Sequence, residues 1–583
     1  MSAARIPFSS YGLRRLPLLG EFLQREVETV LLPPGRLAGG DWLGWGAKQS
    51  ARRAQWYARQ SGGRAIQLED GFLRSYGTGE FPPLSLVVDE LGIYYDSTRP
   101  SSLEQLLASD TDLLAGIAAD VARAKQLLLS ERLSKYNHAP LLDRQLLREG
   151  DRQRVLVIDQ TAGDLSVSLG AASGETFAAM LAAARRENPE ATIYVKTHPE
   201  VTSGHKGGYL TQVQDDARTV VLRQAINPLS LIEQMERIYV VTSTMGFEAL
   251  LAGKPVSVFG LPWYAGWGVT DDRQRCPRRT RQRSVTELFA AAYFHYARYL
   301  NPLTHRRGTI FDVIDWLVHQ REVTRRFPGR MVAVGFPRWR AFNLAPLLSL
   351  TRQQLSFVRD ARQAAGLSPT PHDALLVWGR DAPAEVAVVQ QRSGARLLRV
   401  EDGFIRSVGL GSDLIRPQSL VLDAQGIYFD PSTPSELEEI LNTVKFGEDE
   451  LVRARQLRTY IVEHALTKYN LEPRQRAPWN SDGRKVILVP GQVEDDASIR
   501  YGCGEVNTNL GLLQAARSAE PEAFIVYKPH PDVVSGNRTG RLALARAREF
   551  ADHIETQLSV VSCIEACDMV HTMSSLTGYD ALL

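Results

Sequence analysis

The string EDGFLRS contains a pair of acidic residues followed by glycine, and it includes Glu69 and Arg74. The chain repeats this string almost unchanged as EDGFIRS, which includes Glu401 and Arg406. Each string follows a strand-like run, where a glycine permits a tight turn. A carboxylic acid at such a strand end can serve as general acid or base. The residues also fit an Asp-Gly turn closed by an arginine–glutamate salt bridge. Because the whole string returns, we predict a functional role.

A second acidic position follows the strand-like segments RVLVI and KVILV. The loops after them read DQTAGDLS and GQVEDDAS, and they align Gln160 with Gln492 and Asp164 with Asp496. An aspartate in such a loop suits covalent or acid-base chemistry. Asp and Ser are also preferred helix N-caps, so the loop could equally begin a helix. We favour the functional interpretation.

Two further segments carry groups that suit a phosphate. The string KTHP holds Lys196, His198 and Pro199, and lysine supplies a point charge while histidine supplies a directional donor. A single histidine is more often a core residue, but the strand, the lysine and the second copy favour binding. That copy holds Lys528, His530 and Pro531.

A hydroxyl-rich turn opens the helix predicted in VTSTMGFEALLAG. Ser243 and Thr244 precede this helix, whose free N–H groups favour an anion, and Glu248 in its first turn could reach a ribose hydroxyl. N-capping alone would also explain the hydroxyls. A nearby glycine and lysine favour phosphate binding, and Ser575 opens the echo of this segment in the second copy.

Several other chemistries lack their motifs. The loops contain neither G-x-G-x-x-G with a downstream ribose acid nor G-x-x-x-x-G-K-[ST], which disfavours dinucleotide oxidoreductases and P-loop NTPases. No H-E-x-x-H or Cys/His cluster stands out, so we expect neither a metal nor a cofactor.

The motifs recur at an almost constant offset of 332 residues, which indicates a duplication. The 583 residues correspond to about four domains at roughly 150 residues each. We predict a first module at 1–320 with halves of about 1–150 and 151–320, a linker at 321–330, and a second module at 331–583. The first copy continues well beyond its ALL string, whereas the second stops there at Leu583, so we expect the second module to be incomplete.

Short strand-like runs alternate with helical segments in both copies. This pattern predicts an α/β fold with parallel sheets, in two Rossmann-like halves per module. Ligands of such folds bind beyond the carboxyl ends of the strands, where all four polar clusters lie.

Composition narrows the functional class. Hydrophobic residues make up 44% and charged residues 23%, which is ordinary for globular domains. A net charge of +2 does not support nucleic-acid binding. The four cysteines lack paired C-x-x-C spacing and no long apolar run occurs, so we expect a cytoplasmic protein without structural disulfides or zinc.

The strings EDGF-x-RS, D-x-x-GIY-[YF]-D, K-x-H-P, S-x-x-G-[FY]-[ED]-ALL and LPWYAGWG closely resemble capsule polysaccharide biosynthesis proteins of the KpsC type. The resemblance covers essentially the whole chain, including its duplication. It implies tandem GT-B-like modules, each a retaining transferase of 3-deoxy-D-manno-oct-2-ulosonic acid (Kdo) from CMP-β-Kdo. The first module would form β-2,4 and the second β-2,7 linkages, extending a poly-Kdo linker on a lysophosphatidylglycerol-type lipid.

The resemblance also implies residue roles. Asp164 and Asp496 are expected as nucleophiles, with Asp159, Asp495 and Glu494 as rivals in the same loops. Glu69 and Glu401 are expected as acid-base groups, and Arg74 and Arg406 as acceptor or donor contacts. The expected donor-binding residues are Gln160, Lys196, His198, Pro199, Ser243, Thr244 and Glu248 in the first module and Gln492, Lys528, His530, Pro531 and Ser575 in the second.

The resemblance further implies a protein peripheral to the inner face of the bacterial inner membrane, with capsule assembly and export proteins as partners. The basic run at 273–283 could contact anionic lipid or the acidic Kdo chain, or it could form a solvated face. Trp263, Tyr264 and Trp267 are expected in the core rather than on a sugar. Two other functions stay open, a non-catalytic glycan-binding scaffold of the capsule assembly machinery and a nucleotide-sugar epimerase.

Overall fold

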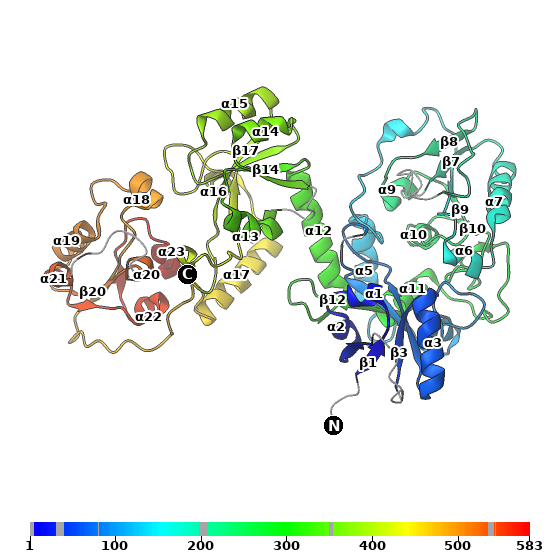
Figure 1. The fold of residues 1–583 in the computed structure, drawn as a ribbon, viewed down its shortest axis with the longest axis horizontal. Coiled ribbons are helices and arrows are strands. Elements are labelled where there is room, and N and C mark those ends of the chain that lie inside the picture. Colours follow the sequence, from blue (N-terminus) through cyan, green and yellow to red (C-terminus); the bar gives the residue numbers. More distant parts are fainter. Residues whose placement is uncertain are drawn as a thin grey trace. The chain divides into compact units, whose positions relative to one another are not determined.

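The computed structural model describes residues 5–30, 40–79, 81–197, 207–348, 354–534, 542 and 544–583. The chain divides into two compact units, Met1–Thr324 and Arg325–Leu583 (Figure 1). The division falls within the segment predicted as a linker, whose first residues belong to helix α12 (Ile310–Arg326). Each unit contains two sheets.

The first sheet of the first unit is mixed, in the order β13-β12-β5-β4-β3-β1-β2. Its parallel strands are β1 (Ile6–Phe8), β2 (Val27–Thr29), β3 (Trp42–Trp45) and β4 (Ala65–Asp70), and its antiparallel strands are β5 (Ser85–Asp89), β12 (Ala297–Leu300) and β13 (Arg307–Gly308). The expectation of a purely parallel sheet is wrong here. No described helix lies between β4 and β5, so the chain turns back as a hairpin rather than crossing over.

The second sheet of the first unit is entirely parallel, in the order β11-β10-β9-β6-β7-β8. Its strands are β6 (Arg154–Ile158), β7 (Thr192–Lys196), β8 (Thr219–Leu222), β9 (Arg237–Val240), β10 (Val256–Val258) and β11 (Asp271–Asp272). Runs of β-branched and aliphatic residues form these strands because both faces are buried, as Val155 and Ile193 illustrate. The strands predicted from four of these runs, β6, β7, β9 and β10, are confirmed.

Helices cover the two sheets of the first unit. They are α1 (Tyr11–Arg14), α2 (Leu19–Leu23), α3 (Gln49–Ser61), α4 (Ser102–Ala108), α5 (Ala118–Ser130), α6 (Leu165–Leu169), α7 (Gly174–Glu187), α9 (Pro228–Ile232), α10 (Met245–Leu251), α11 (Val285–Phe289) and a π-helix at Ala290–Tyr296. Helix α7 contributes Phe177 and Met180 to the core over β6 and β7.

The second unit repeats this topology. Its sheets run β15-β14-β16-β17-β18 and β21-β20-β19-β22, matching β2-β1-β3-β4-β5 and β8-β7-β6-β9, with β18 again antiparallel to β17. The strands are β14 (Met331–Val334), β15 (Leu355–Val358), β16 (Ala374–Trp378), β17 (Arg396–Asp402), β18 (Leu420–Asp423), β19 (Val486–Pro490), β20 (Phe524–Lys528), β21 (His553–Ile554) and β22 (Met569–Val570). The duplication read from the sequence is therefore a duplication of folds.

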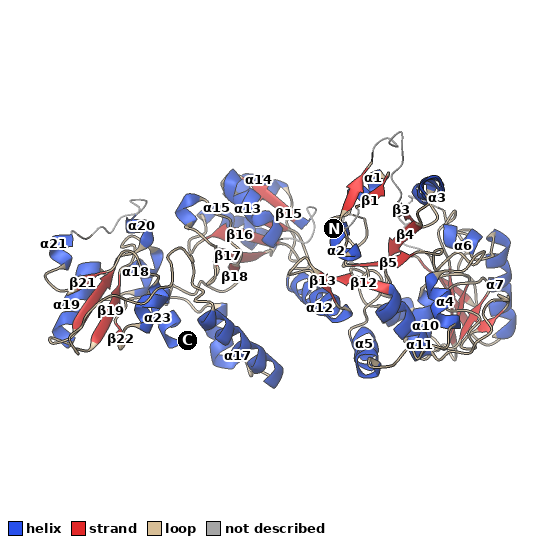
Figure 2. Ribbon diagram, turned by 90° about the horizontal axis from the view of Figure 1, so that it is seen from below, coloured by secondary structure: helices blue, strands red, loops and turns tan. Residues whose placement is uncertain are grey.

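Helices also surround the strands of the second unit (Figure 2). They are α13 (Arg338–Leu348), α14 (Ala361–Gly366), α15 (Ala384–Ser393), α16 (Glu436–Thr443), α17 (Glu448–Glu463), α18 (Ala497–Gly502), α19 (Asn509–Ala519), α20 (Pro531–Val534), α21 (Leu544–Ala547), α22 (Val560–Glu565) and α23 (Leu576–Leu582). Neighbouring residues of β14 alternate between faces: Ala333 joins the cluster with α13, and Val332 joins the cluster with α14 and α15.

The units differ around two pairs of matching helices. In the first unit α4 and α5 bury residues such as Leu107 and Val121, and they contact the π-helix and α11. In the second unit α16 and α17 bury none of their residues, and Leu441 is 71% exposed. No counterparts of β10–β13 occur among the described residues of this unit. The incompleteness of the second module stays a prediction.

Candidate active site

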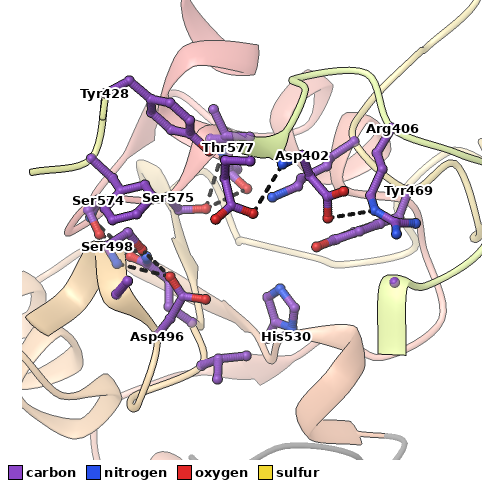
Figure 3. A pocket seen from close by; sticks show the side chains of 18 of the residues that line it. Asp402, Arg406, Tyr428, Tyr469, Asp496, Ser498, His530, Ser574, Ser575 and Thr577 are labelled. Carbon is purple, nitrogen blue, oxygen red and sulfur yellow. Dashed lines mark hydrogen bonds and ion pairs between the residues drawn. The ribbon is translucent and has the colours of Figure 1, made fainter. Parts of the chain in front are cut away.

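A cavity of about 1170 Å³ lies within the second unit, lined by residues from both of its sheets. Four of the segments predicted to do chemistry meet there: Glu401 at the end of β17, Asp496 after β19, His530 after β20 and Ser575 before α23. Figure 3 shows Asp496 and His530 directed into one space, with Asp402 and Arg406 along another side. The segments predicted to lie at strand ends thus line one cavity in this unit.

Asp496 has two roles, because its two oxygens have different surroundings. It is the N-cap of α18, and its Oδ1 accepts hydrogen bonds from the backbone N–H of Ser498 at 2.9 Å and from the Ser498 hydroxyl at 2.8 Å. No described residue donates to Oδ2, and the side chain lines the cavity. The capping and functional interpretations of this aspartate are therefore compatible: one oxygen holds the helix and the other is available for chemistry.

Glu401 is placed to exchange a proton. Burial raises its pKa to about 7, helped by the charges of Asp402 and Asp496 and opposed by Lys468 and the backbone N–H of Asp402. That N–H donates to Glu401 Oε1 at 3.0 Å. A carboxyl group with a pKa near neutrality is suited to general acid-base catalysis.

The side chain of Arg406 already forms an ion pair with another residue of its own motif. Its Nε lies 2.7 Å from Asp402 Oδ2, and its side chain is 3% exposed. Arg74 makes the same pair with Asp70 at 2.7 Å. The arginine of each motif thus pairs with the aspartate and not with the glutamate, and it stabilises the turn that presents Glu69 or Glu401. The substrate contacts predicted for Arg74 and Arg406 stay predictions.

Basic and hydroxyl groups line the other side of the cavity. Lys528 Nζ donates to the Leu558 carbonyl at 2.6 Å and lies 3.2 Å from Glu472 Oε1. His530 Nδ1 accepts from the backbone N–H of Asp532 at 3.1 Å, so a neutral ring carries its proton on Nε2. Pro531, which begins α20, also lines the cavity.

Ser575 is the N-cap of α23, and its Oγ accepts from the backbone N–H of Thr577 at 3.2 Å. Asp580 lines the cavity too, and burial raises its pKa to about 6. These groups add a hydroxyl and a carboxyl group with a raised pKa to the lining of the cavity.

Gln160 and Gln492 bridge neighbouring strand ends. Gln492 Oε1 accepts from the backbone N–H of Ser574 at 3.1 Å, and its Nε2 donates to the Ser574 hydroxyl at 3.1 Å. Gln160 bonds Thr242 in the same way, at 2.9 and 3.0 Å. Both amides hold the loop after β6 or β19 against the end of the adjacent strand, and their direct contact with a donor stays a prediction.

The first unit repeats the carboxylate arrangement. Asp164 is the N-cap of α6, accepts from the Ser166 N–H at 2.9 Å and is exposed. Burial raises the pKa of Glu69, whose Oε2 accepts a hydrogen bond from the Tyr95 hydroxyl at 3.2 Å. The charges of both Glu69 and Asp164 raise the pKa of Tyr94, so both carboxylates lie near the hydroxyl of this tyrosine.

Only some of the residues predicted to bind the phosphate in the first unit belong to the described part of the chain. Lys196 Nζ donates to the Thr197 carbonyl at 2.6 Å, and burial lowers its pKa to about 8. His198 and Pro199 lie outside the described residues. Thr244 is the N-cap residue of α10, while the Ser243 hydroxyl accepts from the N–H of Met245 at 3.3 Å. Among the described residues, no carboxylate forms an ion pair with the buried Lys196 amine.

Glu248 faces inward in a small cavity of about 10 Å³, lined also by Lys135 and Thr244. Its Oε1 accepts from the Ser134 hydroxyl, and burial raises its pKa to about 7. The carboxyl group therefore links the two halves of the first unit. The ribose contact predicted for it stays a prediction.

Several side chains of the basic run and of the LPWYAGWG segment are buried. In the basic run at 273–283, Arg279 and Arg283 have side chains only 2% and 4% exposed, and Arg279 Nε lies 2.9 Å from Glu104 Oε2. Arg279 and Arg283 therefore link the two halves of the unit, whereas Arg273 and Arg275 are exposed, and their contact with anionic lipid or an acidic glycan stays a prediction. Trp263, Tyr264 and Trp267 are 4%, 0% and 0% exposed, which confirms them as core residues.

Sequence reasoning missed the role of a half-buried lysine in each unit. The Lys135 carbonyl accepts from the Arg74 N–H at 3.2 Å, and that of Lys468 accepts from the Arg406 N–H at 3.0 Å. Burial lowers the pKa of Lys135, but Tyr94, Tyr136, Asp70 and Glu69 outweigh it and leave the pKa raised. Each lysine provides a positive charge beside the acidic pair. Its recurrence in both copies was the available signal.

A model of the family described as capsule polysaccharide biosynthesis protein matches residues 41–300 and 373–583. The chain belongs to this family. Among its relatives, capsule polysaccharide modification protein LipA of Neisseria meningitidis serogroup B is 44% identical over 584 residues, covering 98% of this chain and 82% of that protein. Lipopolysaccharide-processing protein LpsZ of Rhizobium meliloti is 41% identical over 259 residues, covering 44% of this chain and 58% of that protein.

A solved structure supports the same membership. KpsC of Thermosulfurimonas dismutans, described as a beta Kdo 2,4 transferase, is 47% identical with a TM-score of 0.50, covering 54% of this chain and 98% of that chain. Within the described residues of this family member, no helix is long and apolar enough to cross a membrane. The same residues contain no group of three or more His, Cys, Asp or Glu side chains that could hold a metal ion.

Proposed function

We propose that this chain is a CMP-Kdo-dependent glycosyltransferase that adds Kdo with retention to a growing β-linked poly-Kdo linker on a phospholipid. The observation that carries the proposal is that Glu401 and Asp496 line one cavity and lie close enough for the charge of Asp496 to raise the pKa of Glu401. In the first unit, the charges of Glu69 and Asp164 both reach Tyr94. The likeness to the Kdo transferase of T. dismutans supports the choice of sugar. Two such sites suit two alternating linkages, β-2,4 in the first module and β-2,7 in the second.

Retention follows from two successive displacements. In the first, Asp496 Oδ2 attacks the anomeric carbon of Kdo, and the bond from that carbon to the CMP phosphate breaks with its electron pair on the phosphate. In the second, the acceptor hydroxyl oxygen attacks the same carbon, the bond to Asp496 breaks, and the hydroxyl proton passes to ionised Glu401. Two inversions restore the original configuration.

The leaving phosphate needs positive charge and hydrogen-bond donors. Lys528, His530 and Ser575 line the same cavity as Glu401, and Lys196 holds the position of Lys528 in the first unit. Donors that are fixed before reaction stabilise developing negative charge without reorganising. We therefore expect transfer without a metal ion.

The acceptor is proposed to be a Kdo-primed glycolipid of the lysophosphatidylglycerol type. A protein acting on such a lipid would associate with the inner face of the inner membrane and meet the proteins that assemble and export the capsule. This association is to be measured by flotation with vesicles that contain or lack the primed lipid.

The deciding experiment is mass spectrometry of products from a Kdo-terminated acceptor with CMP-Kdo made in situ. Asp164→Asn and Asp496→Asn each replace one carboxylate, while asparagine Oδ1 can still accept the capping bond from Ser166 or Ser498, so folding should be kept. We expect each variant to lose one linkage by about a thousandfold or more.

The other outcomes identify the rival functions. Unchanged sugar binding without any transfer by folded protein would favour a glycan-binding scaffold. Isomerised donor in the absence of acceptor would favour a nucleotide-sugar epimerase. Transfer that survives both substitutions would show that these aspartates are not the nucleophiles.

A further inference from the structure

Arg340 stands in the second unit between two indole rings. It lies on α13, which packs on the first sheet of that unit, and it lines the same cavity as Glu401. Its Cζ is 3.9 Å from the centre of the Trp378 ring and 5.1 Å from that of Trp339. Stacking on aromatic faces fixes the plane of the guanidinium and leaves its N–H edge for hydrogen bonds.

The guanidinium of Arg340 has no hydrogen bond or ion pair to any described residue. The neighbouring Asp402 is already bound by Arg406 at 2.7 Å, and Lys528 is bound to Glu472. Burial lowers the pKa of Arg340, while the charges of Glu401 and Asp402 raise it. A half-buried cation without a partner costs free energy, so its position is suited to an anion that arrives from solution.

Among the described residues of the first unit, no arginine or lysine stacks on the matching indole. Trp45 ends β3 as Trp378 ends β16, and both indoles also pack against apolar clusters. Lys135 and Lys468 bring a positive charge to the two glutamates alike, and the exposed Lys48 adds a second one at Glu69. The additional cation thus comes from the start of α3 in the first unit and from α13 in the second, which fits different acceptor geometries.

We propose that Arg340, stacked on Trp378, binds the carboxylate of the acceptor sugar that the second unit glycosylates. This inference rests on the proposed function. A planar guanidinium binds a carboxylate through two parallel hydrogen bonds, and Kdo is a sugar acid. The indole of Trp378 limits the bound carboxylate to one side of the guanidinium.

The position of Arg340 selects the acceptor rather than the donor. The negative charges that reach Arg340 are those of Glu401 and Asp402, at the end of β17 where the acceptor hydroxyl loses its proton. The groups proposed to hold the CMP phosphate come from the other sheet of the unit. Because the donor sugar also carries a carboxylate, the test must measure both substrates.

The first test is kinetic and uses the full chain with Asp164→Asn, so that only the second unit transfers. Arg340→Gln is compared with Arg338→Gln, which removes the same charge from an exposed position of α13 outside the cavity lining. We expect Arg340→Gln to raise the KM for a Kdo-terminated acceptor by about ten- to a hundredfold and to leave the KM for CMP-Kdo within about twofold. Arg338→Gln should change neither. A raised KM for CMP-Kdo alone would overturn the assignment to the acceptor.

The second test does not require catalysis. Hydrogen exchange is measured on the full chain with a synthetic Kdo disaccharide and with its methyl ester. We expect the acid to slow exchange in α13 and in the segment after β16, the ester to have little effect, and Arg340→Gln but not Arg338→Gln to abolish the slowing. Equal slowing by acid and ester, or slowing that survives Arg340→Gln, would overturn the inference. Carboxylate-dependent slowing without any transfer would instead refute the proposed function and leave the carboxylate site standing.

Discussion

The Tyr95 hydroxyl donates a hydrogen bond to Glu69 Oε2 at 3.2 Å, whereas Phe429 takes the corresponding place before Asp430 in the second unit. Phenylalanine cannot donate, so Glu401 keeps the backbone N–H of Asp402 at 3.0 Å but has no tyrosine donor. A hydrogen bond to an ionised carboxylate favours that form and lowers its pKa. The two glutamates proposed as acid-base groups therefore differ in their hydrogen-bond donors.

Tyr95→Phe should raise the pKa of Glu69, and Phe429→Tyr should lower the pKa of Glu401 below about 7, each by roughly one unit. If each glutamate acts as a base, the rate rises with pH through its pKa. The first substitution then moves the acidic limb of the rate profile to higher pH, and the second moves it to lower pH. Transfer by each unit is measured while the other carries the Asp-to-Asn substitution. Two unmoved profiles would remove these glutamates from the proton-transfer step.

Gly46 permits the contact between Tyr95 and Glu69. Its φ is +48°, and an added Cβ would lie 2.2 Å from the tyrosine hydroxyl oxygen and 2.4 Å from Glu69 Oε2. The matching Gly379 has φ +75° with nothing within 4 Å. We expect Gly46→Ala to lower first-unit transfer by more than about tenfold, because it displaces both groups.

Gly379→Ala is the matched control. It should cost about 1 kcal/mol of stability through its positive φ and keep second-unit transfer. Initial rates and thermal unfolding of both variants distinguish these effects. Equal losses of transfer in both units would mean that backbone strain alone explains the result.

The parallel half of the first unit was predictable because its strands are local runs with both faces buried. Val155 and Val195 belong to such runs, and a short continuous run of apolar residues reveals a strand of this kind in the sequence. The antiparallel pairing of β5 was not predictable, because it depends on how the chain turns back after β4. The same holds for β12, which pairs with β5 from more than 200 residues away. Pairing at that distance leaves no local pattern.

The site was predictable where residues follow strands, as Asp164 and His530 do. Arg340 follows no motif, and its neighbours Trp378 and Glu401 lie far from it in sequence. The burial of Arg279 in the basic run could not be predicted for a related reason. A buried arginine and a lipid-facing arginine look alike until Glu104 is found beside Arg279.

Glu248 should make the stability of the first unit depend on pH. Its pKa is raised from 4.5 to about 7 by burial, so the folded state holds a proton that the unfolded state releases. The free energy of unfolding therefore falls as pH rises from about 4.5 to about 7 and then levels off. Glu248→Gln keeps an oxygen for Ser134 and removes the charge.

We expect Glu248→Gln to be about 1–3 kcal/mol more stable than the parent at pH 8 and nearly equal to it at pH 5. Thermal unfolding at the two pH values measures this difference. Glu248→Ala serves as control, since it should lose stability at both pH values by leaving the Ser134 hydroxyl without a partner. A constant difference between the parent and Glu248→Gln across this range would contradict the raised pKa.

Glu104 should be a main link between the two halves of the first unit. It pairs with Arg278 at 2.6 Å and with the buried Arg279 at 2.9 Å. Glu104→Gln leaves a buried guanidinium without its counter-charge, and we expect a loss of about 3 kcal/mol. Asp110→Asn breaks the pair between Arg281 and the fully exposed Asp110, and we expect no measurable change there. Hydrogen exchange of peptides from α4 in increasing urea measures both variants. If both unfold like the parent, the arginines of this run do not hold the halves together, and vesicle binding by Arg279→Gln becomes the next measurement.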